Sequence, residues 1–288
     1  MTIFELVKIA LDELYAEGKN IYSDSLDQKI KEQMTYLSKQ YLELNKAQRT
    51  PINYKDPATR FAYVFKYVAA HGDYLVQLME RLRGVLDGNL FTEEHIWVSC
   101  IGGGPGSDII GVLKYLDDYK TKENVSKIIC YLLDKEQAWA DTWTEFNESL
   151  NANVQLSPNF QPLDVTNKES WKLQQKFLKA DIFTMSYFVS EVKALDENNL
   201  VTDFWKSIFS SAKPGALFLY TDNGHSDFNQ YFDSIWKDQS MECLLTEDNK
   251  KITPRFSEQA AELGIYKNKF NQSPKLASYL SWRVLRKK

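Results

Sequence analysis

The chain of 288 residues is 43% hydrophobic and 26% charged, with 12 glycines and 8 prolines. This composition excludes a disordered, collagen-like or low-complexity protein, and the length suits one large α/β domain with an appendage or two modest domains. Thirty-five basic and 39 acidic residues give a net charge of −4, which argues against broad nucleic-acid binding through phosphate contacts.

Two features concern the environment of the protein. No stretch approaches about 18 consecutive apolar residues, so we expect no membrane-spanning helix. Lys8 and Asp12 interrupt the apolar residues at the N-terminus, which favours an amphipathic helix over a secretory signal. Cys100, Cys130 and Cys243 are dispersed in hydrophobic contexts. We interpret them as reduced core residues and predict a reducing, cytoplasmic compartment.

The pattern up to about residue 90 predicts helices throughout. One helix carries a stripe of large side chains at steps of three or four residues: Leu26, Ile30, Met34, Leu37 and Tyr41. A second helix starts at Asp56 and Pro57, which supply a capping side chain and a proline suited to the first turn. We expect Gly72 to end this helix and Asp73 to cap the next one, which stops at Gly88.

From His95 onward, short apolar runs alternate with helical segments, as in a parallel sheet wrapped by helices. We expect strands at residues 96–101, 127–133, about 158–163, 181–186, 215–220, 241–245 and 276–284. We expect the interleaved helices at about residues 107–119, 136–149, 168–178, 198–211 and 226–237. The sequence therefore predicts an α/β fold, with a doubly wound, mostly parallel seven-stranded sheet in residues 91–288 and a helical cap in residues 1–90.

The first strand runs directly into a loop rich in glycine. Four of five positions are glycine, namely Gly102, Gly103, Gly104 and Gly106, whereas a tight turn alone would need one or two. Glycine in such a loop lets a ligand lie against the backbone. The pattern is GxGxG and not the dinucleotide fingerprint GxGxxG, because the sixth position is Ser107. A turn without a ligand is the alternative.

Further motifs follow the later strands in order. Asp134 ends the second strand, and Leu163-Asp164-Val165 follows the third. Residues 181–187 (DIFTMSY) form the fourth strand, and residues 213–216 (KPGA) precede the fifth. With the glycine loop, these motifs make residues 95–288 resemble the class I S-adenosylmethionine-dependent methyltransferases.

The resemblance implies a Rossmann-like fold, S-adenosylmethionine as cofactor and S-adenosylhomocysteine as product, and we expect no metal. The residues implied to bind the cofactor are Gly102, Gly104, Gly106, Asp134, Asp164, Val165 and Ser186. Asp134 would bind the ribose hydroxyls and Asp164 the adenine amino group. Many family members carry an acidic residue two positions before the first glycine, where this chain has Cys100. Main-chain carbonyls or another residue would then bind the amino group of the cofactor.

Structural roles remain open for both carboxylates and for the cap. Asp134 could cap a helix starting at Glu136, and Asp164 could cap a helix starting near Lys168. In the cap, one helix face carries Arg60, Tyr63, Tyr67 and His71 at helical spacing. We expect this face to close over the cofactor, because aromatic rings attract a sulfonium ion. The alternative is that the tyrosines pack the cap onto the sheet domain.

Methyl transfer is an in-line displacement, so the protein needs a base only where the acceptor is protonated. His225 follows the fifth strand and is our candidate base, with a capping role in its loop as the alternative. Tyr187 and Glu191 are candidate acceptor-site residues, although Glu191 could simply start a helix. We interpret Trp139 and Trp143 as core residues.

The acceptor is less constrained than the cofactor. The acidic chain, with 16 Tyr, 16 Phe and 7 Trp, favours a small-molecule acceptor. The sequence after Ser186 lacks the Pro-Pro clamp of enzymes that methylate exocyclic base nitrogens, which disfavours that acceptor. RNA or protein is the second hypothesis. A catalytically inactive cofactor-binding protein and a nicotinamide oxidoreductase are further alternatives.

Overall fold

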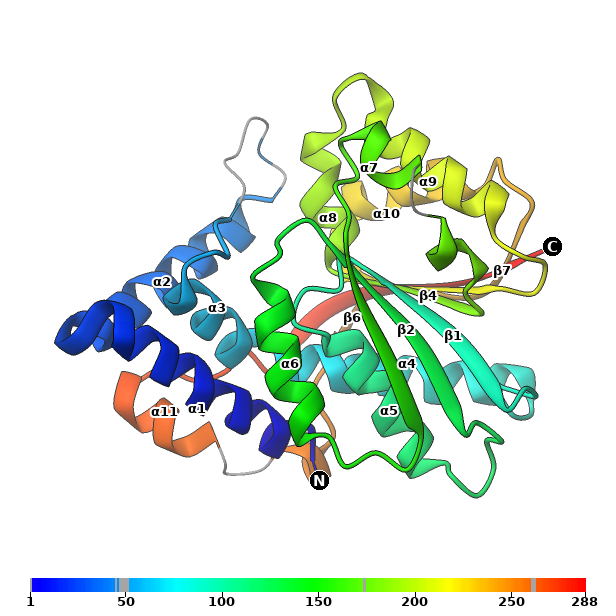
Figure 1. The fold of residues 1–288 in the computed structure, drawn as a ribbon. Helices are drawn as coiled ribbons and strands as arrows, with labels where there is room; N and C mark the ends of the chain where they lie inside the picture. The colour runs from blue at the N-terminus through cyan, green and yellow to red at the C-terminus, as the bar shows by residue number, and fades with distance from the viewer. Residues whose placement is uncertain (1, 45, 47–51, 173–174, 260–262) are drawn as a thin grey trace.

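The computed structural model describes residues 2–44, 46, 52–172, 175–259 and 263–288 (Figure 1). Its strands are β1 (His95–Ile101), β2 (Lys127–Asp134), β3 (Gln155–Pro162), β4 (Ile182–Ser186), β5 (Leu217–Asn223), β6 (Met241–Ile252) and β7 (Ser278–Lys287). Its α-helices are α1 (Ile3–Tyr22), α2 (Leu26–Leu42), α3 (Pro57–Tyr63), α4 (Ala69–Leu86), α5 (Ser107–Asp118), α6 (Trp139–Ser149), α7 (Lys168–Lys172), α8 (Phe188–Val192), α9 (Leu200–Ser211), α10 (Ser226–Trp236) and α11 (Gly264–Phe270).

The strands form one sheet in the order β3-β2-β1-β4-β5-β7-β6. Strands β1 to β5 pair in parallel, and β7 pairs antiparallel with both β5 and β6. The predicted doubly wound, mostly parallel seven-stranded sheet is therefore confirmed. The strand order reverses between β1 and β4, so their carboxyl ends are where a ligand is expected to bind.

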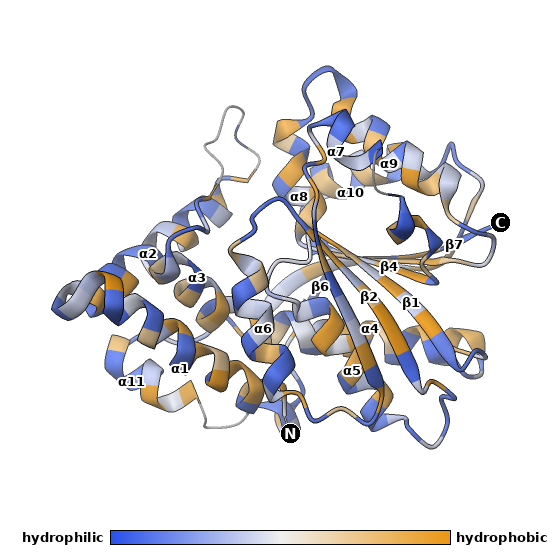
Figure 2. Ribbon diagram, in the orientation of Figure 1, coloured by the Kyte–Doolittle hydropathy of each residue, from blue (hydrophilic) through white to orange (hydrophobic). Residues whose placement is uncertain are grey.

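Both faces of the sheet are buried, which explains why its inner strands are almost continuously apolar. In β2, Ile128 and Cys130 belong to a core shared with α4, α5 and α6. The intervening side chains, such as Tyr131 and Leu133, belong to a second core shared with α7 to α10. Figure 2 shows the resulting hydrophobic inner strands.

The helical cap stands beside the sheet and continues its core. The predicted stripe on α2 is confirmed, since Leu26, Ile30, Met34 and Leu37 are fully buried. Helix α11, which lies between β6 and β7 in sequence, packs on the cap beside α1 (Figure 1). There the rings of Phe61 and Tyr266 lie 5.0 Å apart. Cap and sheet therefore share one hydrophobic core.

The prediction that Gly72 ends a helix is wrong. The chain stays helical from α3 through a π-helical turn (Val64–Val68) into α4. Gly72 lies where α4 crosses α5, and its carbonyl oxygen would be only 2.6 Å from a Cβ at Gly111. These glycines allow a close helix crossing, which explains them without a chain break. Asp73 is not a cap either, because its buried carboxylate pairs with Arg255 at 2.6 Å.

Two elements differ most from the predicted bounds. Strand β6 extends to Ile252 instead of stopping at 245, because it lies at the sheet edge, where polar residues are favoured. The helix expected at 168–178 is instead α7 followed by a 3₁₀ turn (Lys176–Lys179), and residues 173–174 lie outside the described residues.

The cysteines are free, as expected, but only two belong to the core. Cys100 and Cys130 are buried, whereas Cys243 is exposed on β6, contrary to its interpretation as a core residue. None of the helices in the described part of the chain combines the length and apolarity needed to cross a membrane.

Candidate functional site

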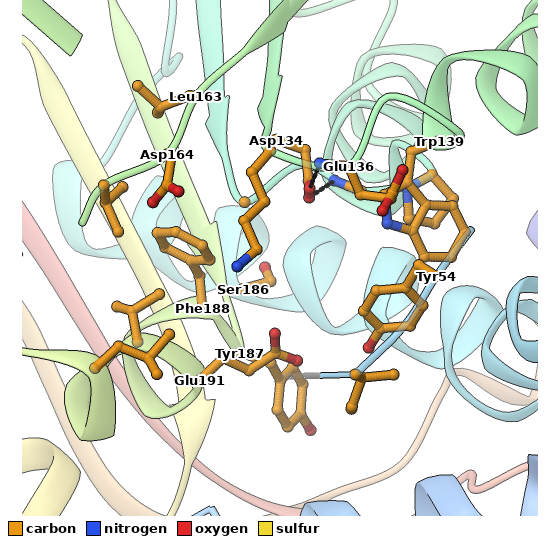
Figure 3. A pocket seen from close by; sticks show the side chains of 18 of the residues that line it. Tyr54, Asp134, Glu136, Trp139, Leu163, Asp164, Ser186, Tyr187, Phe188 and Glu191 are labelled. Carbon is orange, nitrogen blue, oxygen red and sulfur yellow. Dashed lines mark hydrogen bonds between the residues drawn. The ribbon is translucent and has the colours of Figure 1, made fainter. Parts of the chain in front are cut away.

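A pocket opens at the carboxyl ends of β1, β2 and β4, where the strand order reverses. The space between its lining residues is about 910 Å³, part of it open to solvent. Figure 3 shows Asp134 and Glu136 at its top, Asp164 and Phe188 on the left, and Tyr54 with Trp139 on the right. The pocket is therefore lined both by strand ends and by side chains of the cap.

The glycine loop forms part of the pocket floor. Gly102 and Gly104 line the pocket and have positive φ angles of 65° and 44°. A Cβ at Gly102 would lie 2.0 Å from the ring of Phe188, and one at Gly104 would lie 3.8 Å from Oδ2 of Asp134. Gly106 lies behind the lining residues, and a Cβ there would lie 2.4 Å from the ring of Trp143. Gly106 therefore serves loop packing, in contrast to its expected place in the site.

Asp134 ends β2 with its carboxylate at the pocket. Its Oδ2 accepts a hydrogen bond from the Gly104 amide (3.0 Å), and its Oδ1 accepts one from the Glu136 amide (2.9 Å). Burial raises the pKa of Asp134 to about 7, and the two amide hydrogen bonds act in the opposite direction. The capping alternative is not what the structure has, because α6 starts at Trp139 and no side chain caps it; Asp134 binds the turn before this helix and lines the pocket.

Asp164 follows β3 at the other end of the same wall. Its Oδ1 accepts hydrogen bonds from the amide (2.9 Å) and hydroxyl (2.6 Å) of Thr166. Asn167, and not Asp164, accepts from the Glu169 amide at the start of α7 (3.1 Å). The capping alternative for Asp164 is therefore not what the structure has. Its neighbour Val165 also lines the pocket, as expected.

Aromatic side chains form the opposite wall. The ring of Tyr54 lies 5.4 Å from Tyr63 and 4.9 Å from Trp139. The hydroxyl of Tyr41 lies 3.0 Å from that of Tyr54 and donates to Oε1 of Glu191 at 2.8 Å. Trp139 is buried and also lines the pocket, so its interpretation as a core residue was incomplete.

Sequence reasoning missed Tyr54 as a lining residue and Tyr41 as a partner of Glu191. Tyr41 was recognised only as part of an apolar stripe, because helical spacing does not show which side chains of other elements it meets. Tyr54 lies between two helices, and its sequence context carries no periodic signal.

The predicted aromatic face of the cap is only partly at the pocket. Tyr67 adjoins Tyr63 (5.4 Å) and His71 (5.7 Å), so the three rings form a continuous row. Tyr63 lines the pocket, whereas Tyr67 is buried behind it. Burial lowers the pKa of His71 to about 3, so this ring is neutral at ordinary pH. Tyr63 therefore faces the pocket, as expected for a residue near the cofactor, whereas Tyr67 packs within the core, as the alternative proposed.

Arg60 does not reach the pocket. Its guanidinium pairs with both carboxylate oxygens of Glu17 (2.7 Å each) and donates to the carbonyls of Tyr54 (3.1 Å) and Lys55 (2.9 Å). The buried Arg60 therefore holds the backbone of the segment that carries Tyr54, instead of facing a ligand.

Tyr187 connects β4 to α8 in a strained conformation. Its φ angle is +57°, which a bulky residue rarely adopts, and such strain concentrates at functional sites. Its ring lines the pocket and stacks on His71 at 4.1 Å. Its hydroxyl is buried with no hydrogen-bond partner among the described residues, and burial raises its pKa well above the ordinary value. Ser186, just before it, also lines the pocket.

The structure does not bring His225 to this pocket. Its exposed ring caps α10, where Nδ1 accepts a hydrogen bond from the Asp227 amide (3.2 Å). It borders a separate polar hollow at the end of β5. Its role as a base therefore has no support in this geometry, and the capping alternative describes what the residue does.

Solved structures with similar folds include several methyltransferases. A "putative RNA methyltransferase" from Pyrococcus horikoshii is 14% identical, with a TM-score of 0.43, over 90% of this chain and 97% of that chain. A SAM-dependent methyltransferase from Methanosarcina mazei is 13% identical, with a TM-score of 0.39, over 68% and 94%. The N-methyltransferase NodS from Bradyrhizobium japonicum, in complex with S-adenosylhomocysteine, is 6% identical, with a TM-score of 0.42, over 87% and 97%. At these values the similarities concern the fold alone.

A search of curated proteins finds no match to the sequence. A family model described as "Putative SAM-dependent methyltransferase" matches residues 24–220, which is more than half of the chain. The match includes the glycine loop, Asp134, Asp164 and the end of β4. The chain therefore belongs to this family of S-adenosylmethionine-dependent methyltransferases.

Proposed function

We propose that this pocket binds S-adenosylmethionine and that the enzyme methylates a small molecule that enters beside the cap. The strand ends suit an adenosine, because Asp134 offers a carboxylate to the ribose hydroxyls and Asp164 lies at the other end of the same wall. Leu163 and Val165 supply apolar surface for the adenine ring. Gly104 leaves room beside Asp134 that a side chain would fill.

When bound, the cofactor supplies an electrophilic methyl group, which the acceptor takes as the carbon–sulfur bond breaks and S-adenosylhomocysteine is left. Glu191 lines the pocket and is oriented by the hydroxyl of Tyr41, so it is placed to accept a proton from an N–H or O–H acceptor. Tyr54 and Tyr63 exclude water from this side, and their rings suit a positive charge.

The acceptor proposal rests on the charge and shape of the lining. The described lining residues include four carboxylates, of Asp134, Glu136, Asp164 and Glu191, and one lysine, Lys135. An acidic, aromatic pocket disfavours a phosphate-rich acceptor and favours a neutral or cationic small molecule. We infer that residues 1–90 form the acceptor-site region, since Ile52, Tyr54 and Tyr63 belong to the lining. Free cysteines favour a reducing compartment, and we place the enzyme in the cytoplasm.

One observation carries this proposal: strand-end carboxylates and a tyrosine-lined wall meet around a single pocket. The test is transfer of a labelled methyl group to a metabolite extract, to total RNA and to protein, in parallel, after calorimetry with S-adenosylhomocysteine. Label in the metabolite fraction supports the proposal. Label in RNA or protein replaces the acceptor, and S-adenosylhomocysteine binding without label in any fraction identifies an inactive cofactor-binding protein.

A further inference from the structure

We propose that Asp108, in the first turn of α5, supplies the carboxylate that binds the ammonium group of the cofactor's methionine part. This inference rests on the proposed cofactor site. The residue two positions before Gly102 is the buried Cys100, whose neutral thiol offers no charge to an ammonium group, so this group needs another partner.

Asp108 is a buried carboxylate that the fold itself does not satisfy. Asp108 is only 3% exposed, and its Oδ1 has no hydrogen-bond partner in the described part of the chain. Burying a carboxylate without partners is unfavourable, so such a group indicates a missing cation or hydrogen-bond donor. An ammonium group supplies both.

The neighbours of Asp108 form an incomplete polar cluster at the end of β4. The hydroxyls of Thr184 and Ser186 are buried and, like Oδ1, lack partners among the described residues. They lie close enough to Asp108 to lower its pKa, although burial has the larger effect and raises it. Ser186 lines the pocket, whereas Asp108 and Thr184 lie behind the lining, so Ser186 connects the cluster to the pocket.

The carboxylate of Asp108 is also near Cys100. Hydrogen bonding to Cys130 and burial raise the pKa of the Cys100 thiol, and the charge of Asp108 adds to this rise. Asp108 likewise adds to the raised pKa of Tyr63, after burial and Glu191. The carboxylate is therefore close to Cys100 of β1 and to Tyr63.

Helix capping does not explain Asp108. An acidic residue in a first turn commonly accepts backbone N–H groups or faces solvent near the positive end of the helix. Asp108 is buried, and the backbone group that acts on its carboxylate is that of Ser186 on β4, not an amide of its own helix. Its burial near Cys100 and Ser186, with one oxygen unpartnered, fits a ligand-binding role better.

Calorimetry with two ligands tests this assignment. S-adenosylhomocysteine has the ammonium group, whereas 5′-methylthioadenosine lacks the whole amino-acid part. We expect Asp108→Asn to weaken S-adenosylhomocysteine binding about 10- to 100-fold and to leave methylthioadenosine binding unchanged. The matched control Asp164→Asn, at the adenine end, should weaken both ligands alike.

The outcomes separate this inference from the proposed cofactor site. Wild-type protein that binds neither ligand contradicts the site itself. Normal S-adenosylhomocysteine affinity in Asp108→Asn, or an equal loss for both ligands, overturns the role of Asp108 alone. If this variant does not fold, the wild type is compared with S-adenosylhomocysteine and its deaminated analogue, and equal affinities overturn the inference. Recovery of affinity in the double variant Asp108→Asn, Cys100→Asp would support it further.

Discussion

The sheet-side wall of the pocket is made of backbone and carboxylates at strand ends, whereas the cap-side wall is made of aromatic side chains from separate helices and from a segment between two helices. On the sheet side, Gly102 and Gly104 follow β1, Asp134 ends β2 and Asp164 follows β3. Parallel pairing fixes these positions relative to one another, since β1 and β2 are paired over their whole length. This wall is therefore set by the sheet itself.

The cap-side wall depends on contacts between side chains. Tyr41 of α2 links Tyr54 to Glu191 of α8 through its hydroxyl, and Tyr63 of α3 packs against Tyr54. These residues are up to 150 positions apart in sequence. We propose different roles for the two walls: the sheet side would determine cofactor affinity, and the cap side would determine what is methylated.

The largest effect on the sheet-side wall is expected from Gly102→Ala. The residue has a φ of +65°, and an added Cβ would lie 2.0 Å from the ring of Phe188, so the loop or the ring must move into the pocket. We expect S-adenosylhomocysteine binding to be lost in calorimetry. Gly215→Ala is the control, because Gly215 has a φ of +84° with nothing within 4 Å of the added Cβ. It should lose about 1–2 kcal/mol of stability and retain the wild-type affinity.

On the cap side, Glu191→Gln should affect turnover without affecting the cofactor. Glutamine keeps an oxygen that can accept from Tyr41 but cannot take a proton from the acceptor. We expect kcat to fall about 100-fold, within the range for loss of a general base, with unchanged affinity for S-adenosylhomocysteine. Steady-state kinetics and calorimetry check the two quantities separately. If Glu191→Gln also weakened S-adenosylhomocysteine binding about 100-fold, the proposal that the two walls have separate roles would be contradicted.

Asp134→Asn tests the sheet side with a smaller expected effect. Loss of charge-assisted hydrogen bonds to the ribose should weaken S-adenosylhomocysteine binding by about 1.5–3 kcal/mol. Because Asp134 has a pKa of about 7 in the free protein and hydroxyl donors favour its ionised form, affinity should rise from about pH 6 to about pH 8. The variant should lack this pH dependence. If the affinity of the variant rose with pH as steeply as that of the wild type, the pH dependence would belong to another titrating group.

The same raised pKa has a predictable effect on folding. Asp134 keeps its proton in the folded, ligand-free protein at pH values where the unfolded chain, with an ordinary pKa of 3.8, has lost it. Its contribution to stability is therefore complete at low pH and declines as the pH rises from about 4 through about 7. S-adenosylhomocysteine bound to the ionised carboxylate should reduce this loss of stability.

The two walls also differ in how far the sequence predicts them. Asp134, Asp164 and the glycine loop were found because each directly follows an apolar strand, and the ends of parallel strands share one edge of the sheet. The cap wall offered only helical spacing within single elements. That spacing identified Tyr63, but it did not show that Arg60 turns to Glu17 or that Tyr41 meets Glu191.

A similar limit explains the errors in the helices. Gly72 was interpreted as a terminator because glycine commonly ends helices, yet its role is set by Gly111 on another helix, which local sequence does not reveal. Gly106 is expected at the ligand, but it lies outside the pocket lining, and Trp143 occupies the space beside it. In both cases the deciding contact is tertiary.

The smallest expected effect is that of His225→Ala, which tests whether the catalytic edge extends beyond the pocket. The ring is exposed and accepts the Asp227 amide at the start of α10, so its loss should cost about 0.5–1 kcal/mol of stability. Turnover should stay near the wild-type value, because Glu191 and not His225 lies in the lining. Thermal unfolding and steady-state kinetics measure the two effects. A fall in kcat comparable to that of Glu191→Gln would restore His225 as a base, and would require β5 and α10 to approach the pocket during turnover.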